Sequence, residues 1–130
     1  MLIAGCGQVS TDPVAIDPTL DACPICWMSI IDQRFAGQII DDTGFAESFD
    51  DIGCLVLYLK RIAAQGRQEN ILAIYVKDFS TSEWIAAEEG VYVQGRIDTP
   101  MSFGIVAFSS EEAAEELADR INGKIITWEE

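Results

Sequence analysis

Soft sulfur donors are concentrated in the segment Cys23-Pro24-Ile25-Cys26-Trp27-Met28, which holds two thiols and a thioether. A further methionine, Met101, lies far downstream. Thiolate and thioether groups together favour Cu(I) over hard cations. The chain contains no histidine, so the commonest ligand for zinc, Cu(II) and iron is absent. A transition-metal site in this chain would therefore depend on sulfur.

The Cys23/Cys26 pair by itself is compatible with a redox dithiol, half of a zinc site, a disulfide or a copper-binding loop. A redox dithiol is expected at the start of a helix, which lowers the pKa of the first cysteine. Here the pair precedes a predicted strand, and Pro24 follows the first thiol. A zinc site needs two further ligands, and the chain has no second CxxC. A structural disulfide remains open, since small extracellular domains commonly use them.

The two methionines are candidate ligands that also have simpler explanations. Met28 lies two residues after Cys26, so in an extended segment both side chains face the same side. Met101 falls in a predicted loop, where functional groups are often presented, although core filling would also explain it. Cys54 lies within a predicted apolar helix and is expected to be a buried, inert thiol. For Asp50 and Asp51, helix capping explains the pair without a metal.

Composition limits the classes of partner. The chain has 130 residues and is 49% hydrophobic, enough for one ordinary core. It carries 22 acidic and 8 basic residues, a net charge of -14, which argues against nucleic acid or an anionic membrane surface as a partner. No stretch is long enough to span a bilayer.

The N-terminal residues Ile3-Ala4-Gly5-Cys6 resemble a bacterial lipobox, in which small residues precede a cysteine that becomes lipidated. The alternative is an accidental match and a free cysteine in a frayed tail. Polar residues follow as far as Pro18, and we predict that 1–19 forms the lipobox and a flexible tether. With Cys6 lipidated, three thiols remain, so at least one stays unpaired in an oxidising compartment.

The rest of the chain predicts two similar units. Residues 34–40 and 45–49 are expected as strands, followed by a helix from Asp50 or Asp51 to about 65 and a strand at 71–76. Strands at 91–97 and 103–108, a helix that begins near Ser109 and Ser110, and a strand at 124–128 repeat that order. We therefore predict an α+β fold of duplicated ββαβ units, 20–78 and 79–130, packed as one small globular domain.

Four ordered blocks together resemble the NosL family, the copper-chaperone lipoproteins associated with bacterial nitrous oxide reductase. The blocks are residues 3–6, 23–28, 49–54 and 100–108. The resemblance implies a lipid-anchored protein on the periplasmic or cell-surface side of a bacterial membrane, which binds one Cu(I) and passes it to the copper-assembly machinery of the reductase. It also implies a duplicated ββαβ fold. The chain departs from the family in having Trp27 where glycine is usual, and in lacking histidine.

We therefore expect a Cu(I) carrier and not an enzyme, with Cys26, Met28 and Met101 as ligands and Cys23 as a candidate fourth. The expected partners are a copper-receiving enzyme and the membrane, reached through lipidated Cys6, with no nucleic acid. One alternative is a thiol-disulfide oxidoreductase that uses Cys23 and Cys26. Another is an interaction module whose CxxC forms a plain disulfide.

Overall fold

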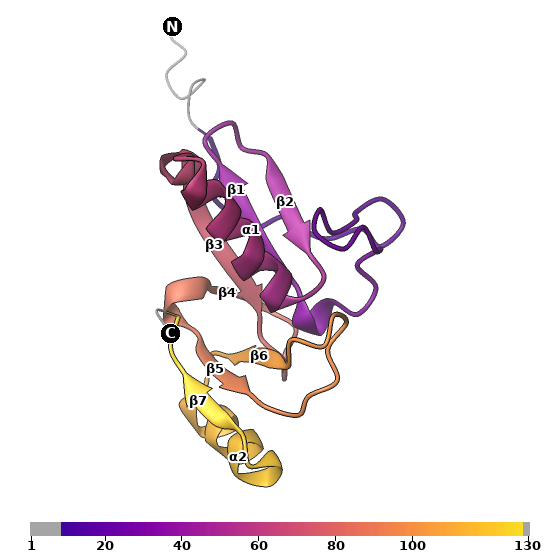
Figure 1. Cartoon of the computed structure of the whole chain (residues 1–130), viewed down its shortest axis with the longest axis vertical. Helices are drawn as coiled ribbons and strands as arrows, with labels where there is room; N and C mark the ends of the chain where they lie inside the picture. The colour runs from indigo at the N-terminus through magenta and orange to yellow at the C-terminus, as the bar shows by residue number, and fades with distance from the viewer. Residues whose placement is uncertain (1–8, 129–130) are drawn as a thin grey trace, which may run out of the picture.

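A computed structural model of the chain describes residues 9–128. In that range the fold is α+β, with two antiparallel sheets and two α-helices, as the sequence predicts (Figure 1). Cys6 lies outside the described residues. None of the described helices is long and apolar enough to cross a membrane.

The first sheet has four strands in the order β2-β1-β3-β4, and neighbouring strands run antiparallel. Its strands are β1 (Gly37–Asp41), β2 (Ala46–Phe49), β3 (Ile71–Lys77) and β4 (Trp84–Ala86). Helix α1 (Ile52–Ala64) follows β2 and packs along one face of this sheet (Figure 1). Short 3-10 turns flank these elements: η1 (Gln33–Phe35), η2 (Gln68–Asn70) and η3 (Ala87–Glu89).

The second sheet has three strands in the order β6-β5-β7, also antiparallel. They are β5 (Val91–Gln94), β6 (Ile105–Phe108) and β7 (Lys124–Ile126), with helix α2 (Glu111–Ile121) between the last two. Ser110 caps α2 by accepting a hydrogen bond from the Ala113 amide. The sequence Ser109-Ser110-Glu111-Glu112 predicts a capping box, but because Ser110 is the cap, Glu112 is the second helical residue and not the third that a capping box requires.

Both sheets contain the predicted order strand, strand, helix, strand, with the first strand of each unit in the middle. Descent of the two units from a duplication stays a prediction. The strand β4 was not predicted, because three residues give too short a pattern. It lies within the predicted second unit, 79–130, but pairs with β3 of the first sheet. The first sheet therefore extends beyond the predicted boundary at residue 78.

The two sheets contribute to one buried cluster. Buried residues of the first sheet and α1, such as Phe49 and Leu55, belong to the same cluster as Tyr92 and Ala107 of the second sheet. The backbone amide of Phe79 also donates to the Ala107 carbonyl, which joins the end of β3 to β6. Neither unit buries its apolar face alone, so their packing produces a single folding unit.

The predicted tether is not free where the structure describes it. The side chain of Gln38 in β1 accepts from the Val14 amide and donates to the Val14 carbonyl, at 2.8 and 2.9 Å. Ile16 is 6% exposed and packs with Ile30 and Ala36. Side chains alternate along a strand, so Gln38 faces away from α1 while its neighbour Ile39 packs beneath the helix. Residues 11–16 thus cover the face opposite α1, and the prediction of a flexible tether is wrong for them.

Candidate metal centre

The CxxC segment forms a closed loop and not the start of a helix. The Cys23 amide donates to the Met28 carbonyl at 2.9 Å, and the Trp27 amide donates to the Cys23 carbonyl at 2.8 Å. Trp27 has a φ of 65°, in the left-handed region that glycine tolerates best. The loop turns Cys23 into the interior, where it is fully buried, and leaves Cys26 partly exposed.

The start of α1 supplies the second half of the site. Asp51 caps the helix by accepting from the Gly53 amide at 2.9 Å, as expected from the sequence. Its neighbour Asp50 has a different role, because its carboxylate faces the CxxC loop. Cys54 lies in the first helical turn and is fully buried. The predicted cap therefore explains only one of the two aspartates.

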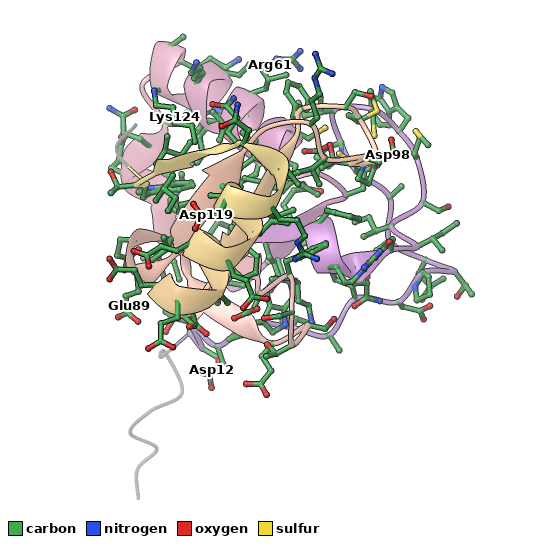
Figure 2. The ribbon with its side chains drawn as sticks, turned by 90° about the horizontal axis from the view of Figure 1, so that it is seen from below. Asp12, Arg61, Glu89, Asp98, Asp119 and Lys124 are labelled. Atoms are coloured by element: carbon green, nitrogen blue, oxygen red, sulfur yellow. The ribbon has the colours of Figure 1, made fainter. Side chains whose placement is uncertain are left out.

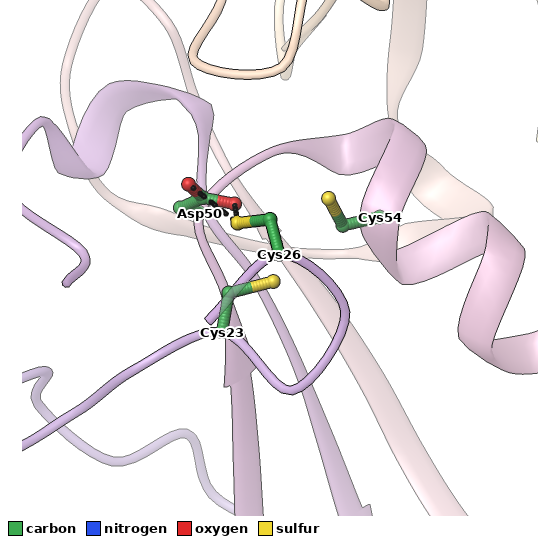
Figure 3. Close-up of side chains that lie close together, drawn as sticks. All are labelled: Cys23, Cys26, Asp50 and Cys54. Carbon is green, nitrogen blue, oxygen red and sulfur yellow. Dashed lines mark hydrogen bonds between the residues drawn. The ribbon is translucent and has the colours of Figure 1, made fainter. Parts of the chain in front are cut away.

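These elements bring three thiols and one carboxylate together, a group we call the thiol–carboxylate cluster: Cys23, Cys26, Asp50 and Cys54 (Figure 3). One ligand atom from each residue lies within 4.8 Å of the others. The Cys26 thiol is 3.2 Å from each carboxylate oxygen of Asp50 and donates its hydrogen there. The three cysteines are all free thiols.

The separations suit a single soft ion. A metal–thiolate bond of about 2.3 Å places two ligand sulfurs at most about 4.6 Å apart. The atoms of the thiol–carboxylate cluster, all within 4.8 Å of one another, are therefore close enough together to share one ion. The carboxylate adds negative charge beside the sulfurs, and the positive end of the α1 dipole favours ionised thiols there.

Protonation of the apo site is set mainly by burial. Desolvation, with smaller contributions from Asp50 and Cys23, raises the pKa of Cys26 to about 11. Burial and the neighbouring Cys23 likewise raise the pKa of Cys54. At neutral pH both groups are thiols, so a bound metal has to displace their protons.

The predicted ligands differ in their surroundings. Cys23 and Cys26 lie together in the thiol–carboxylate cluster, whereas Met28 and Met101 are 50% and 38% exposed. The premise for Met28 fails, because the left-handed Trp27 interrupts the extended segment between Cys26 and Met28. Ligation by either methionine stays a prediction.

The Met101 loop nevertheless reaches the same end of α1. The Met101 amide donates to the second carboxylate oxygen of Asp51 at 2.8 Å. Phe103 packs on Gly53 so closely that a β-carbon there would lie 2.0 Å from its ring. Asp98 of this loop lies on the side where the yellow sulfur atoms gather (Figure 2). Two loops far apart in sequence thus meet the helix start that carries Asp50 and Cys54.

Sequence reasoning did not select Asp50 and Cys54 as candidate ligands. Each had a sufficient local explanation, a helix cap for Asp50 and an apolar helix face for Cys54. The available signal was their position: Asp50 precedes the capping residue Asp51, and Cys54 follows it by three residues. Both side chains lie on the same side of the helix start. Only tertiary packing shows that the CxxC loop occupies that side.

Comparison with known proteins bears on both the family and the fold. A family model with the description NosL matches residues 13–130. No curated protein sequence matches the chain. Among solved structures, the crystal structure of the copper chaperone NosL from Shewanella denitrificans matches with a TM-score of 0.80 at 23% identity, covering 93% of this chain and 96% of that one. At this identity the likeness shows a common fold.

Proposed function

This chain belongs to the NosL family, and from that membership we propose that it carries Cu(I) to a copper-receiving protein and does not act as an enzyme. The observation that supports this most is the convergence of three free thiols and a carboxylate at the start of α1. Thiolates are the ligands that Cu(I) prefers, and the described relative of the same fold is named a copper chaperone.

Binding would begin at the partly exposed side of the cluster. Cu(I) exchanges for the proton that Cys26 shares with Asp50. The buried thiols of Cys23 and Cys54 then supply further sulfur ligands from the protein interior. Met28 and Met101 lie on the exposed segments that adjoin the cluster, so their neutral thioethers suit the entry and release of the ion. A partner removes the ion by replacing these ligands one at a time.

The recipient that we propose is nitrous oxide reductase or its copper-assembly machinery, reached from a lipid anchor at Cys6 outside the cytoplasm. The support is the family and the Ile3-Ala4-Gly5-Cys6 sequence. When the native precursor is expressed in a bacterium, Cys6→Ser should release the protein from the membrane fraction. A native protein that is soluble with and without this change would contradict the anchor.

The oxidoreductase alternative has less support. A reactive dithiol needs a thiol with a lowered pKa, whereas burial raises the pKa of Cys26 to about 11. Measurement of the Cys23/Cys26 reduction potential separates the two functions. A value in the oxidoreductase range of about -270 to -120 mV, with rapid exchange, would favour the alternative.

Competition against a Cu(I) chelator under reducing conditions tests the carrier directly. We expect one Cu(I) per chain and much weaker binding of Zn(II). Cys26→Ala should weaken Cu(I) binding at least about a hundredfold, while Ser109→Ala, remote from the cluster at the start of α2, should leave it unchanged. Zinc binding as tight as copper binding, or an unaltered Cys26→Ala variant, would contradict the proposal.

A further inference from the structure

The end of the first sheet opposite the thiol–carboxylate cluster carries the β1–β2 turn. We propose that this turn end, formed by residues 41–45 and 65–70, rests on the lipid bilayer and directs the cluster away from the membrane. The inference rests on the lipid anchor at Cys6 in the proposed function. It adds a membrane-contacting surface and a fixed orientation to that anchor.

The path of the N-terminal segment locates the anchored end. Val9 is the first described residue, and its side chain lies against the β1–β2 turn, 2.9 Å from where a β-carbon on Gly44 would be. Covalent geometry limits three residues to about 10–11 Å, so Val9 cannot be farther than this from Cys6. A lipid attached to Cys6 therefore holds the turn end within about one helix diameter of the bilayer surface.

The segment then runs away from that end in fixed contact with the sheet. The Tyr75 hydroxyl donates to the Thr11 carbonyl, Gln38 holds both polar groups of the Val14 backbone, and Ile16 is buried. These contacts remove the rotational freedom that a long flexible tether would allow. The position of Val9 thus sets which end of the sheet lies nearest the anchor.

The cluster lies at the far end of the same sheet. Phe49 pairs with Gly37 there, and α1 starts immediately afterwards, whereas Ala46 pairs with Ile40 beside the turn. Figure 1 shows α1 running from the cluster end to the turn end. Its 13 residues span about 20 Å at 1.5 Å per residue. An anchored molecule therefore presents its thiols about that far from the lipid.

The side chains of the turn end suit a lipid surface. Phe45 is 58% exposed, and aromatic side chains are favoured at the membrane interface. The Asp42 amide donates to the Asn70 carbonyl and joins the two segments into one edge. Hydrogen bonds from Thr43 and Phe45 hold the carboxylate of Asp41 within the turn.

The turn end is acidic, like the rest of the chain. Its charged residues are Asp41, Asp42 and Glu69 with Arg67, three acidic and one basic. The net charge of -14 opposes contact with an anionic membrane. A zwitterionic lipid surface carries no net charge to repel these carboxylates, so the lipid that we propose is zwitterionic.

Tryptophan quenching by brominated phosphatidylcholine tests this orientation on the lipidated full-length protein in vesicles. Trp84→Phe and Trp128→Phe together leave Trp27 as the only tryptophan, 80% exposed beside the cluster, as a reporter of the far end. Phe45→Trp in the same background adds a reporter at the turn end, and we expect it to be quenched at least about twice as strongly as the background protein. Insertion of about fifteen Gly and Ser residues between Gln8 and Val9 should abolish that difference, because such a linker adds about 20 Å of reach.

Co-sedimentation with the vesicles separates the two possible failures. Protein that co-sediments without extra quenching of Phe45→Trp would overturn the orientation and leave the anchor intact. Extra quenching that persists after the insertion would overturn the role of the short connection. Protein that does not co-sediment would overturn the anchor and the orientation together.

Discussion

The junctions Phe49-Asp50-Asp51 and Phe108-Ser109-Ser110 occupy the same place in the two sheets, between the end of a strand and the start of a helix. In both, the last residue caps the helix and the middle one turns towards another loop. Ser109 donates both its amide and its hydroxyl to the buried carboxylate of Asp78, at 2.9 and 2.7 Å. Asp50 instead presents an acceptor to a thiol.

The carboxylates of Asp78 and Asp50 differ in whether they remain free to interact with a ligand. Asp78 accepts from Ser109, Ser80 and Thr81, so its carboxylate is fully occupied by protein donors. Asp50 faces three thiols, whose protons a metal ion can replace. One position of the fold thus donates to a buried carboxylate in the second unit and places a carboxylate among thiols in the first. Substitution of Asp78 should therefore change the free energy of unfolding, whereas substitution of Asp50 should change copper affinity.

The largest effect on folding is expected from Asp78→Ala. The change leaves the donors of Ser80 and Ser109 without their buried acceptor, and we expect a loss of about 3 kcal/mol in the free energy of unfolding. Copper affinity should stay unchanged. Thermal or urea unfolding with a chelator competition on the same variant checks both. A large loss of copper affinity with little loss of stability would reverse the comparison.

The carboxylate of Asp78 also predicts a loss of stability at low pH. Burial alone would raise the pKa of Asp78, but hydrogen bonds from Ser109 and Ser80 outweigh it and lower the pKa to about 2. Because the pKa of Asp78 is lower in the folded protein than in the unfolded chain, the ionised carboxylate stabilises the fold. This stabilisation is fully present above the unfolded-state pKa of 3.8 and is lost as pH falls towards about 2. Asp78→Ala should flatten the pH dependence of stability in that window.

Met101→Leu tests whether a thioether of the adjoining loop reaches the ion. Leucine matches methionine in volume and polarity, so stability should stay near that of the wild type. If Met101 is a ligand, Cu(I) binding should weaken by about ten- to a hundredfold. Melting temperature and chelator competition separate the cases. Unchanged affinity would remove Met101 from the site.

Asp50→Asn should have a smaller effect on copper, about tenfold, because the sulfur ligands remain. Loss of the carboxylate also removes one of the groups that raise the pKa of Cys26, so that pKa should fall. The rate of thiol alkylation against pH measures it. An unaltered Cys26 titration together with unaltered copper affinity would mean that Asp50 has only a structural role.

Trp27→Gly should have the smallest effect, a gain of about 0.5–1 kcal/mol in stability. A non-glycine residue in the left-handed region costs about 1–2 kcal/mol, part of which returns as the greater unfolded-state entropy of glycine. Trp27→Ala keeps the strain and is the control. If both variants melt at the same temperature, strain at residue 27 is not the cause.

The periodicity of apolar residues was enough to predict most of the fold. Strands and helices fall within a few residues of their predicted bounds, because alternation and helical spacing are local properties. The strand β4 escaped because it is three residues long. The contact of residues 11–16 with the sheet was not predicted, because their partner Gln38 is a buried polar residue and a hydrophobic pattern does not identify such residues.

Only half of the thiol–carboxylate cluster was predictable, for a related reason. Cys23 and Cys26 are close in sequence, and their chemistry is visible there. Asp50 lies 24 residues from Cys26, and only the packing of α1 against the loop brings them to 3.2 Å. For Met28, the assumed extended backbone was wrong because Trp27 adopts a positive φ. Local patterns identify donors, whereas tertiary contacts select which of them converge.

X-ray absorption at the copper edge, on protein loaded with one equivalent of Cu(I), tests the central claim most directly. The thiol–carboxylate cluster predicts nearest neighbours that are mainly sulfur at about 2.3 Å, with one sulfur fewer in Cys26→Ala. Loading both proteins below saturation keeps the ion in its tightest site. A first shell dominated by nitrogen or oxygen, or a spectrum unchanged by Cys26→Ala, would contradict the account.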